Sequence, residues 1–256
     1  MTLRWVPGWN GLNEPEAVSY VAAVEAADGQ ELEFGVARAI NDFVTGCKQD
    51  NIWDAIKACC ILAGARTLDG ALVPLVGGAP TNPGNVFVDA DYDRKTGLVG
   101  DGSTKYLDSN RNNNADPQDS KHISVYASTK GFLSGLNAGY IGTGNSGTSL
   151  FASGISQTLV FGGINGGTVF DPINIAPGLI GVNRSGPTSL QCRGGGSTLT
   201  SSTPSAFPAS LSISIFRQPD YSNARLAFYS IGESLDLAAL DTRVSNLITA
   251  IGAAIP

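Results

Sequence analysis

The sequence predicts a mainly β protein: an antiparallel sandwich with a small helical region before it and one helix after it. Charged residues make up only 15% of the chain and 32 of its 256 residues are glycine, which is typical of a turn-rich β protein. After residue 85, short apolar runs alternate with Gly, Asn, Ser and Pro turns at intervals of about 8–14 residues. Residues 123–127 and 211–215 alternate strictly between apolar and polar, so these strands are expected to bury one face and leave the other open.

Residues 1–76 are expected to form a helical N-terminal attachment region. It begins with an irregular aromatic arm, residues 1–13, whose Trp5 and Trp9 have too few sequence neighbours to bury themselves. Helical spacing of apolar residues follows at 14–27 and 36–47, and a third helix is expected from Asn51, an N-cap residue, through Ile52, Trp53, Ile56 and Cys60. Residues 77–85, rich in Pro and Gly, are expected to be a linker.

Residues 86–256 are expected to form the sandwich domain and its C-terminal helix. The expected strands are residues 86–88, 103–107, 123–127, 139–142, 148–152, 157–162, 178–183, 190–193, 211–216 and 225–230. A helix capped by Ser234 or Asp236 follows, with an apolar stripe at Leu237, Leu240, Val244, Leu247 and Ile251. The stripe fits either docking on the parent sandwich or self-association, and docking is favoured because two heptads bury little surface by themselves.

Composition excludes several classes of partner. The net charge of −6 argues against nucleic acid, whose binding depends on cationic contacts to phosphate. No apolar run reaches the ~18 residues of a spanning helix, and Glu25 interrupts the N-terminal apolar stretch, so neither membrane insertion nor a signal peptide is expected. The four cysteines, without a C-x-x-C pair, are expected to be reduced and buried.

Two glycine-rich segments resemble nucleotide-binding loops but fail in detail. Residues 142–147 match G-x-G-x-x-G, yet a strand rather than a helix is expected to follow, and no acid lies about 20 residues on. Residues 97–105 approach a phosphate-binding loop, but Ser103 stands where the lysine belongs. Both segments are interpreted as turns, so no cofactor is expected.

Two further motifs could suggest chemistry. His122 is the only histidine and has neither metal-ligand spacing nor a G-x-S-x-G motif nearby, so a structural role at the edge of the sandwich is expected. Asp89, Asp91 and Asp93 alternate on one face of an expected strand, like the start of a calcium loop. Arg94 and Gly100 break that motif; a solvated acidic edge is favoured, and a calcium site involving residues 108–119 stays open.

The distribution of acids argues against an enzyme. No glutamate lies between residues 34 and 232, and between residues 120 and 232 the only acids are Asp171 and Asp220, each beside a proline. Glycosidases need a pair of carboxylates about 5–9 Å apart, usually including Glu. The sequence therefore predicts a non-enzymatic protein without catalytic residues.

Five segments carry a family resemblance: residues 48–61, residues 100–107, Arg184, residues 211–216, and residues 225–235 with the helix at 240–248. Together they resemble the concanavalin A-like (laminin G-like) jelly-roll sandwich domains of tailed-bacteriophage virion proteins. The resemblance implies a structural protein on the virion, such as a tail fibre, baseplate or capsid-decorating component, sometimes with affinity for glycans. It further implies virion partners, here expected to bind through residues 1–76, and a homo-oligomer.

Three functions stay open after this resemblance. A structural virion protein, adhering to a host surface glycan, is favoured over a carbohydrate-active enzyme and over a free-standing lectin-like module. Glycan sites on such scaffolds need an exposed aromatic ring beside hydrogen-bonding groups. Tyr92, Tyr106, Tyr140 and Tyr221 are the candidates, but aromatic residues in strands are commonly core, so no glycan-binding site is assigned.

Overall fold

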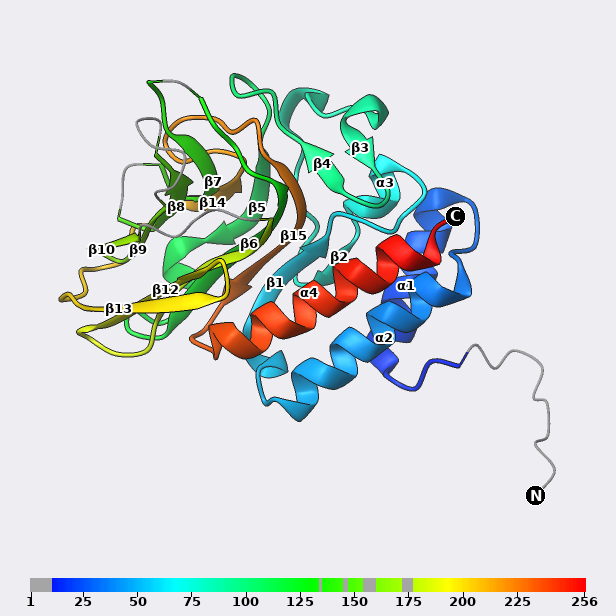
Figure 1. Cartoon of the computed structure of the whole chain (residues 1–256), viewed down its shortest axis with the longest axis horizontal. Helices are drawn as coiled ribbons and strands as arrows, with labels where there is room; N and C mark the ends of the chain where they lie inside the picture. Colours follow the sequence, from blue (N-terminus) through cyan, green and yellow to red (C-terminus); the bar gives the residue numbers. More distant parts are fainter. Residues whose placement is uncertain (1–10, 134, 145–146, 154–159, 172–176) are drawn as a thin grey trace.

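The structure, a computed structural model, describes residues 11–133, 135–144, 147–153, 160–171 and 177–256, with only the backbone described for 167–171. Two antiparallel sheets pack face to face, and helices cover the outer face of one of them (Figure 1). The predicted fold class, a mainly β antiparallel sandwich with an N-terminal helical region and a C-terminal helix, is confirmed. Residues 1–10 of the aromatic arm, with Trp5 and Trp9, lie outside the described residues, as do parts of the glycine-rich turn at 142–147 and of the strand expected at 157–162.

The larger of the two sheets, sheet A, has nine strands in the described part of the chain. Its order is β13 (Ser197–Ser202), β12 (Ser189–Gly194), β11 (Gly178–Arg184), β6 (Lys121–Thr129), β15 (Arg225–Gly232), β1 (Ile56–Ile61) and β2 (Pro74–Val76). The short strands β3 (Tyr92–Asp93) and β4 (Gly97–Val99) join it through β15. The smaller sheet, sheet B, has the order β10 (Gly167–Asp171), β9 (Val160–Ile164), β8 (Ser149–Ala152), β7 (Ala138–Gly142), β14 (Ser212–Ile215) and β5 (Leu107–Asn112).

The helices form a third layer on sheet A. The main ones are α1 (Pro15–Asp28), α2 (Phe34–Gln49) and α4 (Leu237–Ala254), and α3 (Leu68–Ala71) is a single turn. Four 3-10 turns complete the chain: η1 (Trp53–Ala55), η2 (Pro83–Asn85), η3 (Asp89–Asp91) and η4 (Asn113–Ala115). Helix α4 begins at Asp236, whose Oδ1 accepts hydrogen bonds from the amides of Ala238 (2.7 Å) and Ala239 (3.2 Å). The predicted Asp236 cap is therefore confirmed.

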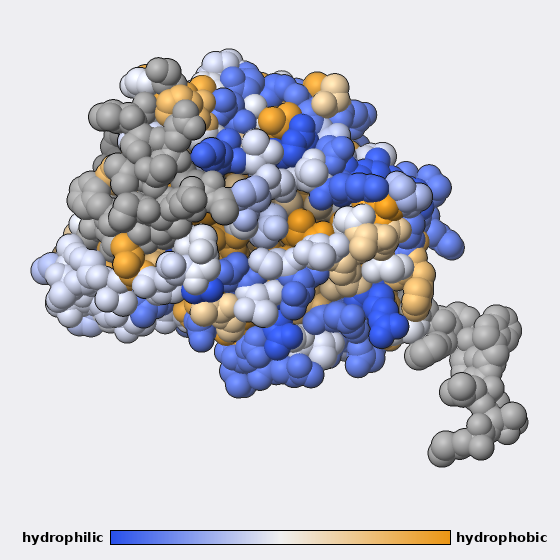
Figure 2. All heavy atoms as spheres, in the orientation of Figure 1, coloured by the Kyte–Doolittle hydropathy of each residue, from blue (hydrophilic) through white to orange (hydrophobic). Residues whose placement is uncertain are grey.

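The apolar stripe of α4 is buried within its own chain. Leu237, Leu240, Val244, Leu247 and Ile251 are at most 2% exposed, and the last four share a core with α2 and sheet A. The guanidinium of Arg243 on α4 also binds the carboxylate of Asp50, with distances of 2.7 and 2.9 Å. Docking on the parent sandwich, the favoured prediction, is confirmed, although Figure 2 shows apolar residues interrupting the polar surface along this helical layer.

The helix predicted from Asn51 is wrong. Asn51 has a left-handed backbone (φ 57°), η1 is one turn long, and residues 56–61 form strand β1 between β15 and β2. Cys59 faces the helical layer and Cys60 faces the sandwich core, so β1 is apolar on both faces. A strand buried on both faces loses the alternation that distinguishes it from a helix. The sandwich thus includes strands from residues 1–76, where the sequence predicted only helices.

The segment between β2 and β4 also differs from expectation. Residues 86–88 form no strand, because the backbone of Phe87 bonds to the side chain of Asn82 (2.9 and 3.1 Å) rather than to a neighbouring strand. Within the predicted linker, Thr81 pairs with Asp108 of β5 through two backbone hydrogen bonds of 2.8 and 2.9 Å. Residues 77–85 are therefore tied to sheet B at this point.

The four cysteines, all within the described residues, are free and buried, as predicted. Burial raises the pKa of the Cys47 and Cys60 thiols to about 12, so both stay protonated at neutral pH. In the described part of the chain no helix is long and apolar enough to cross a membrane.

Candidate functional site

The three aspartates proposed for calcium do not share a strand face, contrary to the sequence expectation. Asp89 and Asp91 lie in η3, and only Asp93 lies on a strand. Asp91 holds the ammonium of Lys105 at 2.5 Å, and Oδ1 of Asp93 accepts the amides of Lys95 (3.0 Å) and Thr96 (2.8 Å). No cluster of three or more metal-ligating side chains occurs among the described residues. These carboxylates therefore fix loops.

His122 has a structural position, but it does not lie at a sheet edge as predicted. Its strand, β6, runs between β11 and β15, and the side chain is fully buried. Nδ1 lies 2.6 Å from the carbonyl oxygen of Glu233, so Nδ1 carries the proton, and Nε2 lies 2.9 Å from the hydroxyl of Ser230. Burial lowers the pKa of His122 to about 4. The imidazole is neutral at physiological pH and cannot reach a bound molecule.

Arg184, part of the family resemblance, is also internal. Its Nε donates to the carbonyl of Ile164 (3.0 Å) and its Nη1 to the carbonyl of Thr203 (2.9 Å). The side chain has no exposed surface. Arg184 therefore ties β11 to β9 and to the segment after β13, and it is not a ligand-binding residue.

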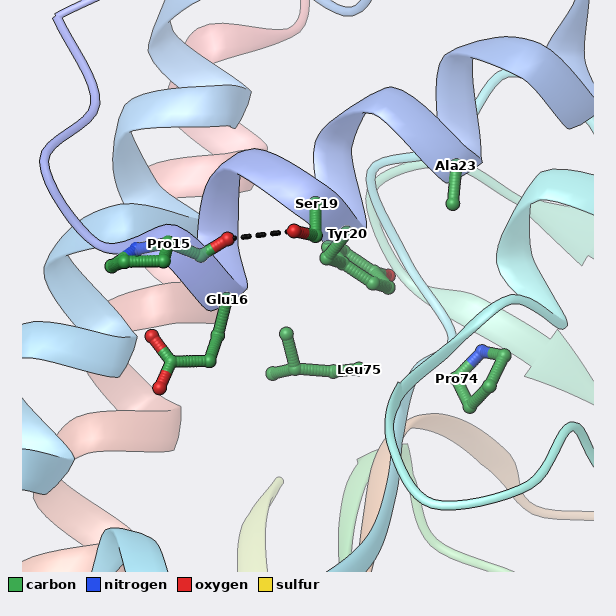
Figure 3. A pocket seen from close by; sticks show the side chains of 7 residues that line it. All are labelled: Pro15, Glu16, Ser19, Tyr20, Ala23, Pro74 and Leu75. Atoms are coloured by element: carbon green, nitrogen blue, oxygen red, sulfur yellow. Dashed lines mark hydrogen bonds between the residues drawn. The ribbon is translucent and has the colours of Figure 1, made fainter.

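A surface cavity with a volume of about 460 Å³ lies between α1 and β2 (Figure 3). Its lining consists of Pro15, Glu16, Ser19, Tyr20, Ala23, Pro74 and Leu75. The hydroxyl of Ser19 donates to the carbonyl of Pro15 (2.9 Å), and the ammonium of Lys48 beside Glu16 (2.7 Å) lowers the pKa of that carboxyl. Burial raises the pKa of Tyr20. Glu16 stays ionised and Tyr20 protonated, so this cavity offers no pair of groups poised for proton transfer.

A surface cluster at one end of sheet B brings together two of the four candidate tyrosines. Strands β14 and β5 pair Ile215 with Leu107, so Tyr106, just before Leu107, and Arg217, just after β14, lie at the same end of the sheet. Arg217 forms an antiparallel bridge with Tyr221 across the turn that follows. All three side chains are partly exposed. We call Tyr106, Arg217 and Tyr221 the tyrosine–arginine cluster.

The cluster has a defined internal geometry. The rings of Tyr106 and Tyr221 meet edge to face, with centroids 6.2 Å apart and an interplanar angle of 65°. The guanidinium carbon of Arg217 lies 5.0 Å from the Tyr106 ring centroid and 5.5 Å from that of Tyr221. Both distances are within the range of cation–π attraction. Two aromatic rings therefore hold one cation in place.

Backbone hydrogen bonds fix the two loops that carry the cluster. Asp101 accepts the amides of Ser103, Thr104 and Lys105 at 2.8–3.0 Å and the hydroxyl of Thr104 at 2.6 Å, and against the effect of burial these bonds lower its pKa. The amide of Gly102 then donates to the carbonyl of Ser222 (3.1 Å), which joins the Tyr106 loop to the Tyr221 turn. Within that turn, the amide of Ser222 donates a hydrogen bond to the carbonyl of Phe216 (2.8 Å). The cluster is thus preorganised.

The guanidinium of Arg217 makes no hydrogen bond or ion pair with any described residue, and its described contacts are with the two rings. A guanidinium presents five N–H donors in a planar fork that matches a carboxylate. The carboxylate of Asp220, the residue before Tyr221, accepts the amide of Asn137 (3.3 Å) and makes no ion pair with Arg217 in the described structure, so the guanidinium keeps its donors. The arrangement can therefore bind an anionic, partly apolar molecule.

Of the other two candidate tyrosines, Tyr140 belongs to the interior and Tyr92 is partly buried against the core. Tyr140 is fully buried, and its hydroxyl accepts the amide of Gly131 at 3.2 Å. The hydroxyl of Tyr92 donates to the carbonyl of Ala65 at 2.9 Å, and burial raises its pKa strongly. Arg217 was missed from the sequence, since no motif links it to Tyr106, which lies more than a hundred positions earlier in the chain.

A second polar surface lies at the start of α4. A groove of about 380 Å³ there is lined mainly by hydroxyl and amide side chains: Asn183, Ser185, Gln191, Thr198, Ser234, Leu235, Asp236, Leu237 and Ala238. None of these residues carries an aromatic ring on which a sugar could stack. The tyrosine–arginine cluster is therefore the stronger candidate site.

No protein-family model matches the chain, and no curated protein matches it in sequence. Among solved structures, a crystal structure of an HCR/D mutant is similar at 12% identity and a TM-score of 0.51, covering 75% of this chain and 52% of that one. The binding domain of botulinum neurotoxin serotype D aligns at 10% identity and a TM-score of 0.48, covering 78% and 52%. Domain 4 of AbnA, a GH43 extracellular arabinanase from Geobacillus stearothermophilus solved with arabinotriose, aligns at 9% identity and a TM-score of 0.40, covering 71% and 83%.

The chain thus spans about half the length of the first two structures. The likeness to the HCR/D mutant, at this level of identity, concerns the fold alone. It agrees with a two-sheet β-sandwich as the architecture of this chain.

Proposed function

We propose that this protein is a non-enzymatic glycan-binding module, displayed on a bacteriophage virion as part of a tail fibre, baseplate or capsid decoration. The proposed ligand is a glycan that carries a carboxylate, bound at the tyrosine–arginine cluster. One observation carries this proposal: Arg217 is held between two tyrosine rings, and no described residue accepts a hydrogen bond from its guanidinium. A surface arginine with a structural role alone would be expected to pair with a carboxylate or a carbonyl oxygen.

The chemistry of an acidic sugar matches the cluster in two ways. A sugar carboxylate can accept two parallel hydrogen bonds from the guanidinium of Arg217, and such charge-assisted bonds contribute about 1.5–3 kcal/mol each. The apolar C–H face of a sugar ring can pack on the exposed part of Tyr106 or Tyr221. Because the two loops are already fixed by hydrogen bonds, binding orders few side chains and loses little entropy.

Display on a particle requires a second surface, and we assign it to the N-terminal helices. Phe34, the first residue of α2, is 62% exposed and lines a surface cavity of about 360 Å³ together with Leu12, Val21, Glu25, Glu31, Leu32 and Ala37. Exposed aromatic rings beside an apolar hollow commonly mark protein interfaces. This surface supports the proposed contact with other virion proteins.

Calorimetric titration tests the glycan site. We expect wild-type protein to bind sialyllactose and oligogalacturonate at least tenfold more tightly than lactose, and Arg217→Gln to lose this preference, because the carboxylate loses its paired donors. Arg38→Gln is the matched control: Arg38 is an exposed arginine on α2, so the change in net charge is identical. Equal binding of lactose, or equal affinities for the two variants, would overturn the proposal.

Particle incorporation tests the virion surface. We expect Phe34→Ser to reduce the occupancy of the protein on assembled particles, because the proposed contact with another virion protein includes the Phe34 ring. Phe207→Ser is the control, since Phe207 is 92% exposed but lies between β13 and β14, outside the helical layer. Unchanged occupancy with Phe34→Ser, or the same loss with both variants, would remove the helical surface from the proposal.

A further inference from the structure

Among the residues that the structure describes, strand β13 is the last strand of sheet A and pairs with one neighbour, β12. Figure 1 shows it at the outer end of the sheet, and Figure 2 shows the surface there as pale and weakly polar. All but one of its six residues are exposed in the described structure, including Leu199 at 38%. β13 therefore offers a free row of backbone donors and acceptors.

This edge lacks the features by which proteins normally protect an exposed strand. The β13 sequence, Ser-Thr-Leu-Thr-Ser-Ser, contains no charge and no proline, and its pairing with β12 is unbroken over six residue pairs. At the opposite end of sheet A, β2 is only three residues long and begins with Pro74. Short length and proline are protective features, so only the β13 end is open to another strand.

The outward-facing groups of β13 follow from its register. The amide of Thr203, just after β13, donates to the carbonyl of Thr188 (3.0 Å), which is a bond directed toward the β12 side. Because hydrogen-bonding direction alternates along a strand, Ser201 and Leu199 also bond inward. The amides and carbonyls of Thr198, Thr200 and Ser202 point away from the sheet.

The same three residues are self-complementary. An antiparallel pairing with a two-fold axis at Thr200 places Thr200 opposite its own copy and Thr198 opposite Ser202 of the second copy. Each of these pairs exchanges two hydrogen bonds, which gives about six between the copies. Thr–Thr and Thr–Ser are favourable cross-strand pairs, and no like charges meet.

We propose that β13 is the interface of a homodimer, in which two copies of this chain join edge to edge into one continuous sheet. Closed two-fold symmetry is the commonest arrangement of homo-oligomers and explains a strand that complements itself. The interface is small, so the dimer forms reversibly, at protein concentrations of roughly 10–100 µM. This inference concerns a surface distinct from the glycan site and does not depend on it.

Sedimentation velocity between about 1 and 500 µM, spanning the range expected for a weak interface, tests the dimer. Thr200→Lys places two ammonium groups against each other at the two-fold axis, so we expect its dimer to be at least tenfold weaker. Thr200→Val, which keeps the backbone and the size of the side chain, is the matched control and should dimerise like wild type. Because Thr200 is exposed and bonds outward, neither change should alter the thermal melting of the monomer.

The register is tested by mixing variants. Thr200→Glu should also be monomeric, and an equimolar mixture with Thr200→Lys should form a heterodimer, since the position faces itself only in the proposed arrangement. Hydrogen exchange provides a second readout, in which the amides of Thr198, Thr200 and Ser202 gain protection at high concentration. A wild-type protein that stays monomeric throughout, or a Thr200→Lys variant that dimerises like wild type, would overturn the proposal.

Discussion

Arginine has two different roles in this chain, and the surroundings of each residue decide which. Arg184 is fully buried and its guanidinium donates to carbonyl oxygens of Ile164 and Thr203. Arg217 is partly exposed and contacts the rings of Tyr106 and Tyr221, and its guanidinium has no acceptor among the residues that the structure describes. Both arginines follow an apolar strand, so the sequence alone gave no basis for distinguishing them. The family resemblance pointed to Arg184, whereas the surface chemistry lies at Arg217.

His122 makes the stability of the fold depend on pH. Burial lowers its pKa from 6.5 to about 4, so the folded protein binds fewer protons than the unfolded chain between these values. This contribution to stability is complete above pH 6.5 and is lost as the pH falls toward 4, by roughly 3 kcal/mol in total. We expect chemical denaturation to show this loss, and His122→Asn to flatten the stability curve between pH 6.5 and 4.

The quantity to compare between wild type and His122→Asn is the slope of the unfolding free energy against pH. The absolute free energy is not comparable, because His122→Asn also disturbs the bonds to Glu233 and Ser230. A variant that loses stability on acidification as steeply as wild type would show that other groups control the acid sensitivity.

At the scale of elements, strands were predictable where apolar and polar residues alternate along the sequence. Both β6 and β14 were located from that pattern, but only β14 has the open face that was expected, because His122 and Ser124 of β6 are fully buried as well. β1 is buried on both faces, between the helical layer and the core, and was mistaken for a helix. β13 is exposed on both faces and has no apolar pattern at all, so it was missed. Alternation records a difference between two faces, and these strands have none.

The buried side chains of helix α4 should contribute strongly to the free energy of unfolding. Leu240 has no exposed surface and packs in the cluster that joins α4 to α2 and sheet A. We expect Leu240→Ala to cost about 2–4 kcal/mol of unfolding free energy, because it leaves a cavity in the core. Val18→Ala on α1, where the side chain is 39% exposed, should cost much less. Equal melting temperatures for Leu240→Ala and wild type would contradict the docking of α4.

The position of β1 limits how the attachment region can be studied. Deleting residues 1–76 would remove β1 and β2, the strands of sheet A that follow β15, together with helices α1 and α2. We therefore expect the truncated chain to lack a cooperative thermal transition. A folded, cooperatively melting product would show that the sandwich is independent of this segment, as the division at residue 76 predicted from the sequence implies.

At the scale of the whole molecule, the fold class was predictable but only half of the site was. Composition and turn spacing gave the two-sheet sandwich, and Tyr106 and Tyr221 were among four candidate aromatic residues. Arg217 joins them only because β14 pairs with β5 and brings both strand ends together. Tyr92 and Tyr140 could not be excluded beforehand, since the burial of Tyr140 and the hydrogen bond from Tyr92 to Ala65 depend on contacts with distant segments.

The molecule should bind glycans without cleaving them. No glutamate lies between residues 34 and 232, and Asp220 lies beside the cluster, where the described residues provide no second carboxylate for a catalytic pair. We expect no release of reducing ends during prolonged incubation with acidic or neutral oligosaccharides. Turnover that disappears in Asp220→Asn would contradict a purely adhesive role.

The most direct test of the central claim is a nuclear magnetic resonance titration with sialyllactose and its carboxyl-reduced analogue. If Arg217 and the two tyrosines bind the sugar carboxylate, sialyllactose will shift the ring signals of Tyr106 and Tyr221 and the Nε–H signal of Arg217. The buried ring of Tyr140 will stay unchanged, and the reduced analogue will shift all of these signals far less. Shifts confined to the groove near Asn183, or equal shifts with both ligands, would contradict a carboxylate-binding site at this cluster.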